Sequence, residues 1–295
     1  MSRELKIATA PSRLTALWDN AIIDWDGLRD RLRDPHISHE TVAAYHAMPK
    51  AKQGDIKDVG GFVGGHLANG RRRNGNVLSR SLLALDLDHP NPGLVDELPT
   101  LLPCEWAVYS THSHTPEAPR LRLIVPLGRD VDAEEYAAIG RRIAADIGID
   151  AFDDSTYEPH RLMYWPSRPI DGEYIYWEHR GPWLDPDATL ARYDDWRDIS
   201  TWPTSSRQAE ALRHRADKQA DPLDKPGLVG AFCRTYPIAE AITTFLPEVY
   251  EPAAGGRFTY IAGESTAGVQ TYDDRFAYSH PGTDPAGGQL CNAFD

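Results

Sequence analysis

Two aspartates one residue apart, Asp86 and Asp88, end the apolar segment Leu82–Leu87 and give the sequence its clearest chemical signal. Successive side chains of a strand point to opposite faces, so both carboxylates would share the face opposite the odd-numbered leucines. Two adjacent anions repel each other and lose hydration when buried. A divalent cation removes both costs, and Mg²⁺ and Mn²⁺ prefer such hard oxygen ligands. The spacing also fits helix caps and solvated surface acids.

Three other segments carry side chains that could act on a phosphate together with this pair. The first supplies hydroxyl and imidazole groups, the second supplies guanidinium groups, and the third supplies another acid, an imidazole and another cation. The residues are, in that order, Ser113, His112 and His114; Arg120 and Arg122; Asp153, His160 and Arg161. Carboxylates hold divalent metals, and metals and arginines bind phosphates. If the segments converge, we expect a nucleoside triphosphate site where two metals activate a 3′-hydroxyl and stabilise the leaving pyrophosphate. Taken singly, each segment could be a turn, a solvated strand face or a helix cap.

The elements that must position these groups can be predicted from periodicity. Alternating or continuous apolar runs predict strands at 82–88, 106–111, 119–127, 162–166, 174–177 and 257–261. The second and third of these runs would form a hairpin. Apolar residues three or four apart predict helices at 25–33, 132–147 and 238–246, and Ser38–Thr41 could cap another.

A basic turn, Arg71–Asn76, follows a glycine-rich segment from Lys57 to Gly70. It could be a solvated loop or a loop that contacts phosphates.

Bulk composition is ordinary for a globular protein, since the 295 residues are 41% hydrophobic and 25% charged. A net charge of −13 excludes a uniformly basic nucleic-acid binder but leaves room for a local basic groove. The three cysteines are widely spaced, which fits a reducing compartment and no zinc pattern. No apolar run reaches membrane-spanning length and no signal peptide begins the chain, so we expect a cytoplasmic protein without membrane contact.

Changes in composition predict three parts. Residues 1–200 would form the catalytic domain, and 201–226, rich in Ser, Arg, Asp, Lys and Gln, would form a linker with a helix at 206–219. Residues 227–295 would form a small accessory domain, whose ending at Asp295 suggests a fragment of a longer protein.

These motifs resemble the archaeo-eukaryotic primase superfamily in its primase-polymerase branch. The resemblance rests on Leu85–Asp88, on Ser110–His114, on Phe152–Asp153, and on Arg161 eight residues after Asp153. More narrowly, residues 55 to 295 resemble the N-terminal part of phage and prophage replication proteins of the virulence-associated E type, in which a helicase domain follows.

The resemblance implies an α/β (α+β) fold with an RRM-like central sheet, a second α/β lobe that forms a catalytic cleft, and a smaller C-terminal accessory unit. It implies a DNA primase-polymerase that uses dNTPs or NTPs on a single-stranded DNA template with two Mg²⁺ or Mn²⁺ ions. Asp86, Asp88 and Asp153 would hold the metals, with Asp150 or Asp154 as alternatives to Asp153. The nucleotide's phosphates would contact His114 beside Ser113, or else His112, together with Arg122, His160 and Arg161.

Three other functions fit parts of the pattern. The Asp-x-Asp strand also fits a haloacid-dehalogenase-like phosphatase, although Pro90 stands where that chemistry requires Thr or Val. His112 and His114 would fit a rolling-circle nickase, with Tyr136 or Tyr193 as the nucleophile. A non-catalytic nucleic-acid-binding module is expected if the acids are simply solvated.

Overall fold

The computed structural model describes residues 3–91, 93–208 and 219–295. The chain divides into two compact units, unit 1 (residues 1–189) and unit 2 (residues 190–295). The predicted linker, 201–226, falls in unit 2, and its residues 209–218, with most of the helix predicted at 206–219, lie outside the described residues. The three-part division made from composition stays a prediction.

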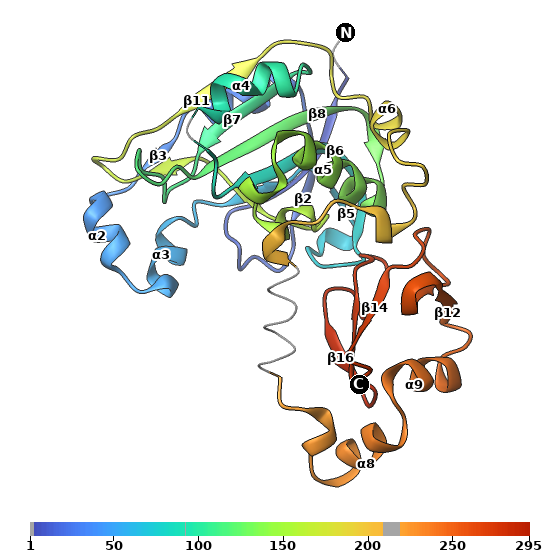
Figure 1. Cartoon of the computed structure of the whole chain (residues 1–295). Coiled ribbons are helices and arrows are strands. Elements are labelled where there is room, and N and C mark those ends of the chain that lie inside the picture. The colour runs from blue at the N-terminus through green and yellow to red at the C-terminus, as the bar shows by residue number, and fades with distance from the viewer. Residues whose placement is uncertain (1–2, 92, 209–218) are drawn as a thin grey trace. The chain divides into compact units, whose positions relative to one another are not determined.

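A five-stranded antiparallel sheet is the centre of unit 1 (Figure 1). Its strands, in spatial order, are β11 (Tyr176–His179), β7 (Trp106–Ser110), β8 (Leu121–Val131), β6 (Val77–Leu87) and β5 (Gly65–Leu67). Helix α4 (Leu94–Leu101) connects β6 to β7, and α5 (Ala133–Ile147) follows β8. This β-α-β-β-α order, with β8 between β6 and β7, is the split arrangement expected of an RRM-like sheet. The predicted mixed α/β fold is confirmed.

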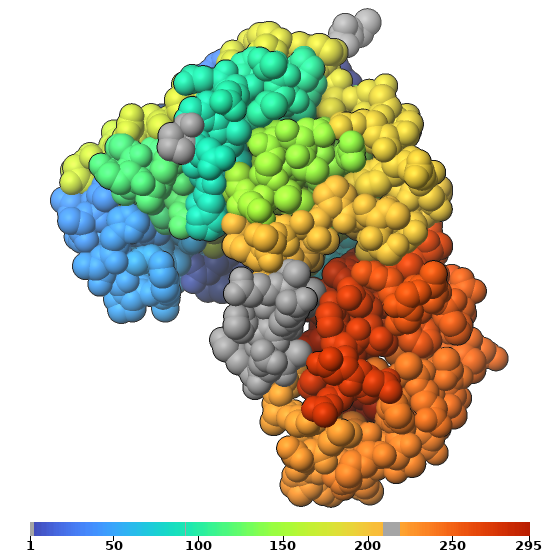
Figure 2. Space-filling model, in the orientation of Figure 1, coloured from blue at the N-terminus to red at the C-terminus, as the bar shows by residue number. Residues whose placement is uncertain are grey.

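Helices α4 and α5 cover one face of this sheet, and their residues form part of the surface of unit 1 on the side seen in Figure 2. Helix α5 begins with a capping box, in which the Asp132 side chain accepts the Glu135 N–H and the Glu135 side chain accepts the Asp132 N–H. A Cβ atom at Gly140 would lie 3.4 Å from Leu83 and 3.7 Å from Leu85. The glycine therefore lets α5 approach the odd-numbered leucines of β6 closely.

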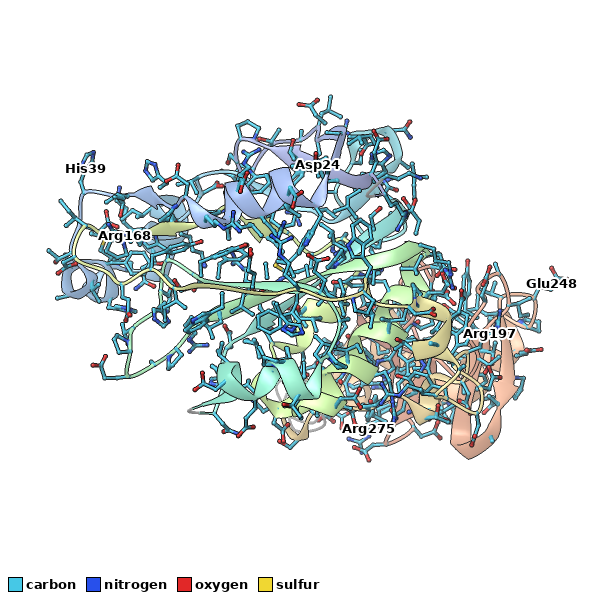
Figure 3. The ribbon with its side chains drawn as sticks, turned by 90° about the horizontal axis from the view of Figure 1, so that it is seen from above. Asp24, His39, Arg168, Arg197, Glu248 and Arg275 are labelled. Carbon is cyan, nitrogen blue, oxygen red and sulfur yellow. The ribbon has the colours of Figure 1, made fainter. Side chains whose placement is uncertain are left out.

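The opposite face of the central sheet packs against a second layer. Leu82 and Ala84 of β6 share a buried cluster with Leu5, Leu28 and Met163 of this layer. The layer contains a sheet of β2 (Asp19–Ile23), β1 (Leu5–Ala10), β4 (Gly61–Val63) and β9 (Met163–Tyr164), together with helix α1 (Trp25–Arg33). Figure 3 shows α1, capped by the labelled Asp24, on the side of the central sheet away from α4 and α5.

Smaller elements complete unit 1. They are the parallel pair β3 (His36–Ile37) and β10 (Ser167–Arg168), the helices α2 (Val42–Ala47), α3 (Lys50–Ile56) and α6 (Pro186–Leu190), and the 3₁₀-helices η1 (Ala68–Gly70), η2 (Ile149–Ala151) and η3 (Asp154–Tyr157). The predicted cap at Ser38–Thr41 is found at its last residue, since the Thr41 hydroxyl accepts the Ala44 N–H at the start of α2.

Unit 2 contains an antiparallel sheet covered by a helix. The strands, in spatial and chain order, are β12 (Tyr250–Ala253), β13 (Arg257–Tyr260), β14 (Val269–Tyr272), β15 (Phe276–Ser279) and β16 (Leu290–Asn292). The other elements are α8 (Gly227–Thr235), α9 (Ile238–Phe245), and the 3₁₀-helices η4 (Ile199–Thr201), η5 (Pro222–Asp224) and η6 (Ala254–Gly256). Ile238 and Ile242 of α9 pack with Phe258 and Val269 of the sheet. Across both units, no helix in the described part of the chain has the length and apolar character needed to cross a membrane.

Candidate active site

The first predicted aspartate lies opposite the second predicted arginine across two neighbouring strands. Asp86 of β6 pairs with Arg122 of β8, and Arg122 Nε donates to Asp86 Oδ1 at 2.6 Å. Each side chain is 9% exposed. Arg122 Nη1 also donates to the Tyr164 carbonyl of β9 at 2.9 Å. Burial alone would lower the pKa of Arg122, but the neighbouring Asp86 and Tyr109 raise it above its usual value, so the guanidinium stays protonated.

The third predicted aspartate comes from a separate segment and meets the first one. Asp153 N–H donates to the Asp86 carbonyl at 3.0 Å. Arg161 Nη2 donates to Asp153 Oδ2 at 3.0 Å, and Arg161 Nε lies 3.8 Å from Asp86 Oδ2. One guanidinium therefore contacts carboxylates from two segments 67 positions apart in the chain. Asp153 is thus placed beside both Asp86 and Arg161.

Asp88 continues the same strand direction just beyond β6 and is more open to solvent. Arg120 Nη1 lies 3.0 Å from Asp88 Oδ2, and the two side chains are 32% and 38% exposed. The two Asp–Arg pairs thus form successive rungs between the ends of β6 and β8, one buried and one half-exposed. As predicted from the alternation of side chains, Asp86 and Asp88 share one strand face, and Arg120 and Arg122 meet them there.

Buried hydrogen bonds hold the 152–161 segment against β6. Thr156 Oγ1 accepts the Asp86 N–H at 2.9 Å and donates to the Ala84 carbonyl at 3.1 Å. Tyr136 of α5 donates its hydroxyl to the same carbonyl at 3.0 Å. Further along, the fully buried Arg80 donates to the Pro159 carbonyl at 2.6 Å. The position of Asp153 and Arg161 is therefore fixed by strand, helix and loop contacts together.

His112 is held by protein groups on both ring nitrogens. Nδ1 lies 2.9 Å from the Ser167 hydroxyl, and Nε2 lies 2.9 Å from Glu40 Oε1. The residue is 4% exposed, and burial lowers the pKa of its imidazole despite the attraction of Glu40. These bonds join the end of β7 to β10 and to the segment before α2. They leave no ring nitrogen of His112 for a phosphate.

Ser113 and His114 are engaged differently. The Ser113 hydroxyl lies 3.1 Å from that of Tyr45. His114 Nδ1 accepts the Arg120 N–H at 3.2 Å, so in the neutral ring the proton is on Nε2. That Nε2 is buried and has no hydrogen-bond partner among the described residues. Burial lowers the pKa of His114, which keeps the ring neutral at pH 7.

His160 lies among cations. Burial, followed by the charges of Arg72, Arg161 and Arg80, lowers the pKa of its imidazole to about 4. The Arg72 guanidinium lies 3.5 Å from the His160 carbonyl and over the ring of Trp18. His160 is thus a neutral residue on a positively charged side of the site.

Lys57, just after α3, is a cation of the site that the sequence analysis did not identify. Its ammonium lies 5.4 Å from the centre of the Tyr164 ring. Burial and the charges of Arg122 and Arg161 lower the pKa of Lys57, while Asp86 raises it. The only signal in the sequence was its place at the start of the glycine-rich segment, which does not specify a site.

The three aspartates have the chemistry expected of a magnesium or manganese site, but their carboxylates are now paired with arginines. In the described part of the chain, no three His, Cys, Asp or Glu side chains are grouped so as to hold a metal ion. Hard carboxylate oxygens at the end of one strand and on the adjoining loop fit such a cation. Arg122, Arg120 and Arg161 would have to release them first.

Comparison with known proteins agrees with the sequence-based assignment. The model of the VapE N-terminal domain family matches residues 1–205. This chain belongs to that family. All the candidate residues lie inside the VapE N-terminal match, and the virulence-associated E prediction is confirmed. A solved structure, the AEP domain of the primase-polymerase of cyanophage S-2L, matches 64% of this VapE N-terminal chain and 88% of its own chain, at 14% identity and a TM-score of 0.35.

Proposed function

We propose that this protein is a primase-polymerase, which transfers nucleotides from dNTPs or NTPs to a 3′-hydroxyl on a single-stranded DNA template in phage or plasmid replication. The observation that carries the proposal is Arg161, whose guanidinium contacts both Asp86 and Asp153. Acids and phosphate-binding cations from separate segments therefore share one place. Membership of the VapE N-terminal domain family supports a replication role.

The aspartates and the cations would have different roles in the reaction. Asp86, Asp88 and Asp153 would hold Mg²⁺ or Mn²⁺ ions, which, when bound, supply activation of the 3′-hydroxyl and neutralisation of the pyrophosphate. Arg161 and Arg122 would exchange their carboxylate partners for phosphate oxygens, which guanidinium groups bind through paired hydrogen bonds.

The neighbouring polar groups would orient the nucleotide. His114 Nε2–H is a donor without a partner among the described residues and lies on the residue after Ser113, so it is our first choice for a phosphate contact. His160 is kept neutral and would donate or accept a hydrogen bond rather than supply charge. A helicase domain following this chain in a longer protein is part of the same proposal.

The test is incorporation of labelled nucleotides on a primed or unprimed single-stranded template with Mn²⁺ or Mg²⁺. We expect Asp88→Asn and Asp153→Asn each to slow incorporation by about 100-fold or more, because removing a metal ligand takes away several kcal/mol of transition-state stabilisation. Both side chains are partly exposed, so the fold should survive. Asp96→Asn, an exposed acid on α4, is the control.

Full incorporation by both variants would reject the proposal. Phosphate release without incorporation would favour the phosphatase, and nicking with a tyrosine–DNA adduct would favour the nickase. Binding of single-stranded DNA with no reaction in any metal would favour the non-catalytic module.

A further inference from the structure

The turn Arg71–Arg72–Arg73 between β5 and β6 contains three cations that form no ion pair with a carboxylate in the described part of the chain. Other arginines of unit 1, such as Arg3 and Arg129, are ion-paired. The chain has a net charge of −13, so its composition alone would lead us to expect carboxylate partners for most arginines. Three adjacent arginines without such partners depart from that expectation. Clustered cations without carboxylate partners indicate an anionic ligand.

The backbone of this turn is tightly fixed. Ala68 N–H donates to the Asn76 carbonyl at 2.7 Å, and Trp18 N–H donates to the Gly70 carbonyl at 2.8 Å. Gly70 has a φ of 63°, and a Cβ atom there would lie 2.6 Å from the Trp18 carbonyl oxygen. The arginines are therefore carried by a constrained turn rather than by a free loop.

The three side chains alternate between the surface and the interior. Arg71 and Arg73 are exposed, whereas Arg72 is half-buried over the Trp18 ring. Arg72 Nε is buried and has no hydrogen-bond partner among the described residues, and Glu158 attracts it from beyond ion-pair distance. Burial lowers the pKa of Arg72, but an arginine remains charged at neutral pH. Arg72 is thus a desolvated charge whose hydrogen bond, among the described residues, goes to a backbone carbonyl rather than to an anion.

Arg72 connects this turn to the candidate active site. Its Nη1 lies 3.5 Å from the carbonyl of His160, and the next residue, Arg161, contacts Asp153. Two exposed guanidinium groups flanking one anchored guanidinium suit consecutive phosphates along a strand better than the compact triphosphate of one nucleotide.

We propose that Arg71, Arg72 and Arg73 bind the sugar-phosphate backbone of single-stranded nucleic acid beside the active site. This inference rests on the proposed function only in naming that strand as the template. The contacts would be independent of base sequence, because phosphates carry no sequence information.

The test is the binding of a labelled oligo-dT strand, followed by fluorescence anisotropy at several salt concentrations, with EDTA and no nucleotide. We expect Arg71→Ala with Arg73→Ala to weaken binding roughly tenfold at low salt. The slope of log K against log salt is negative and should become about 1.4 less steep, at about 0.7 for each phosphate that is no longer neutralised. Arg72→Gln should weaken binding in the same direction.

Arg33→Ala with Arg180→Ala is the matched control, because it removes the same charge from two arginines that are ion-paired to Glu178. An unchanged slope in the turn variant, or an equal change in the control, would overturn the inference. So would unchanged strand binding with weakened dATP binding, which would assign the turn to the triphosphate. Binding needs no turnover, so the two proposals can fail separately. A change of slope in a protein that never incorporates nucleotides would support strand binding by the arginine turn and reject only the proposed polymerase activity.

Discussion

The acidic group around Arg161 and the histidine turn after β7 were both predicted to contact the substrate, but they are built in opposite ways. In the first, Asp86, Asp153 and Arg161 are charged groups paired with one another, and two of them reach solvent. In the second, His112 is buried and held on both nitrogens by Glu40 and Ser167. Ion pairs at a partly exposed site can be exchanged for ligands, whereas a saturated buried hydrogen-bond network holds the fold.

The same contrast exists within the acidic group, between its two Asp–Arg rungs. Arg122–Asp86 is buried, and Arg120–Asp88 is about one-third exposed on each side. Removing one partner of a buried pair leaves an uncompensated charge, while an exposed charge is simply hydrated. The inner rung should therefore stabilise the fold as well as serve the site.

The largest expected effect separates these two rungs. Arg122→Met should lower the free energy of unfolding by about 3–5 kcal/mol, since the buried Asp86 loses its hydrogen-bonded partner and keeps the more distant Arg161 Nε at 3.8 Å. Arg120→Met, the same substitution at the residue just before β8, should lower the free energy of unfolding by less than about 1 kcal/mol. Urea denaturation followed by circular dichroism measures both. Equal losses would mean that burial does not distinguish the rungs.

The next effect tests the histidine turn. His112→Leu removes the His112 bond from the buried Ser167 hydroxyl and one of two bonds from Glu40, which keeps the Ser38 hydroxyl. A buried polar group without a partner costs about 1–3 kcal/mol. We expect a lower free energy of unfolding by roughly 2–3 kcal/mol and unchanged affinity for a nucleotide. His39→Leu, an exposed histidine labelled in Figure 3, is the control and should be neutral. Weaker nucleotide binding without a loss of stability would instead make His112 a ligand.

Much of the acidic group could be predicted because strand geometry is local. The alternation of leucines and aspartates at 82–88 specified the face of Asp86, and the pattern at 119–127 specified the face of Arg122. The structure adds their pairing, an antiparallel register with Asp86 opposite Arg122. The strands predicted at 82–88 and 119–127 miss up to five residues of β6 and β8, and β5 was not predicted. The helix predicted at 132–147 was equally local, and α5 begins one residue later, after the Asp132 cap.

The partners of the histidines could not be predicted, because they come from segments without a distinctive pattern. Glu40 precedes a helix of six residues, and Ser167 lies in a strand of two. Short elements of this kind exist through tertiary contacts rather than through their own periodicity. Lys57 was missed for the same reason, since only the packing of α3 near Tyr164 brings it to the site.

His160 gives a third effect, through pH. Its pKa is about 4 in the folded protein, against an ordinary value of 6.5. Below about pH 6.5 the unfolded chain binds a proton at this ring while the folded chain does so only near pH 4, so the free energy of unfolding falls as the pH drops across that interval. The loss due to this group should be on the order of 2 kcal/mol between pH 6.5 and 4.5.

Carboxylates titrate in the same range, so the measurement is a difference between two proteins. His160→Gln should lose less stability than the wild-type protein between pH 6.5 and 4.5, while the two should run parallel above pH 7. Parallel curves over the whole range would show that burial and the surrounding cations do not lower the pKa of His160.

The smallest effect concerns Lys57, the cation that belongs to the acidic group but was absent from the residues predicted from sequence. Lys57→Met should weaken binding of dATP by about fivefold to tenfold, close to 1 kcal/mol, because one phosphate-binding charge is removed. Stability should be unchanged or slightly higher, since a half-buried cation leaves the vicinity of Arg122 and Arg161. Lys52→Met, a change of an exposed lysine on the preceding helix α3, should change neither quantity. Loss of a group that binds the ligand should weaken dATP binding and leave the stability of the fold unchanged. A Lys57→Met protein that is destabilised but binds dATP normally would instead show that Lys57, like His112, is a structural residue.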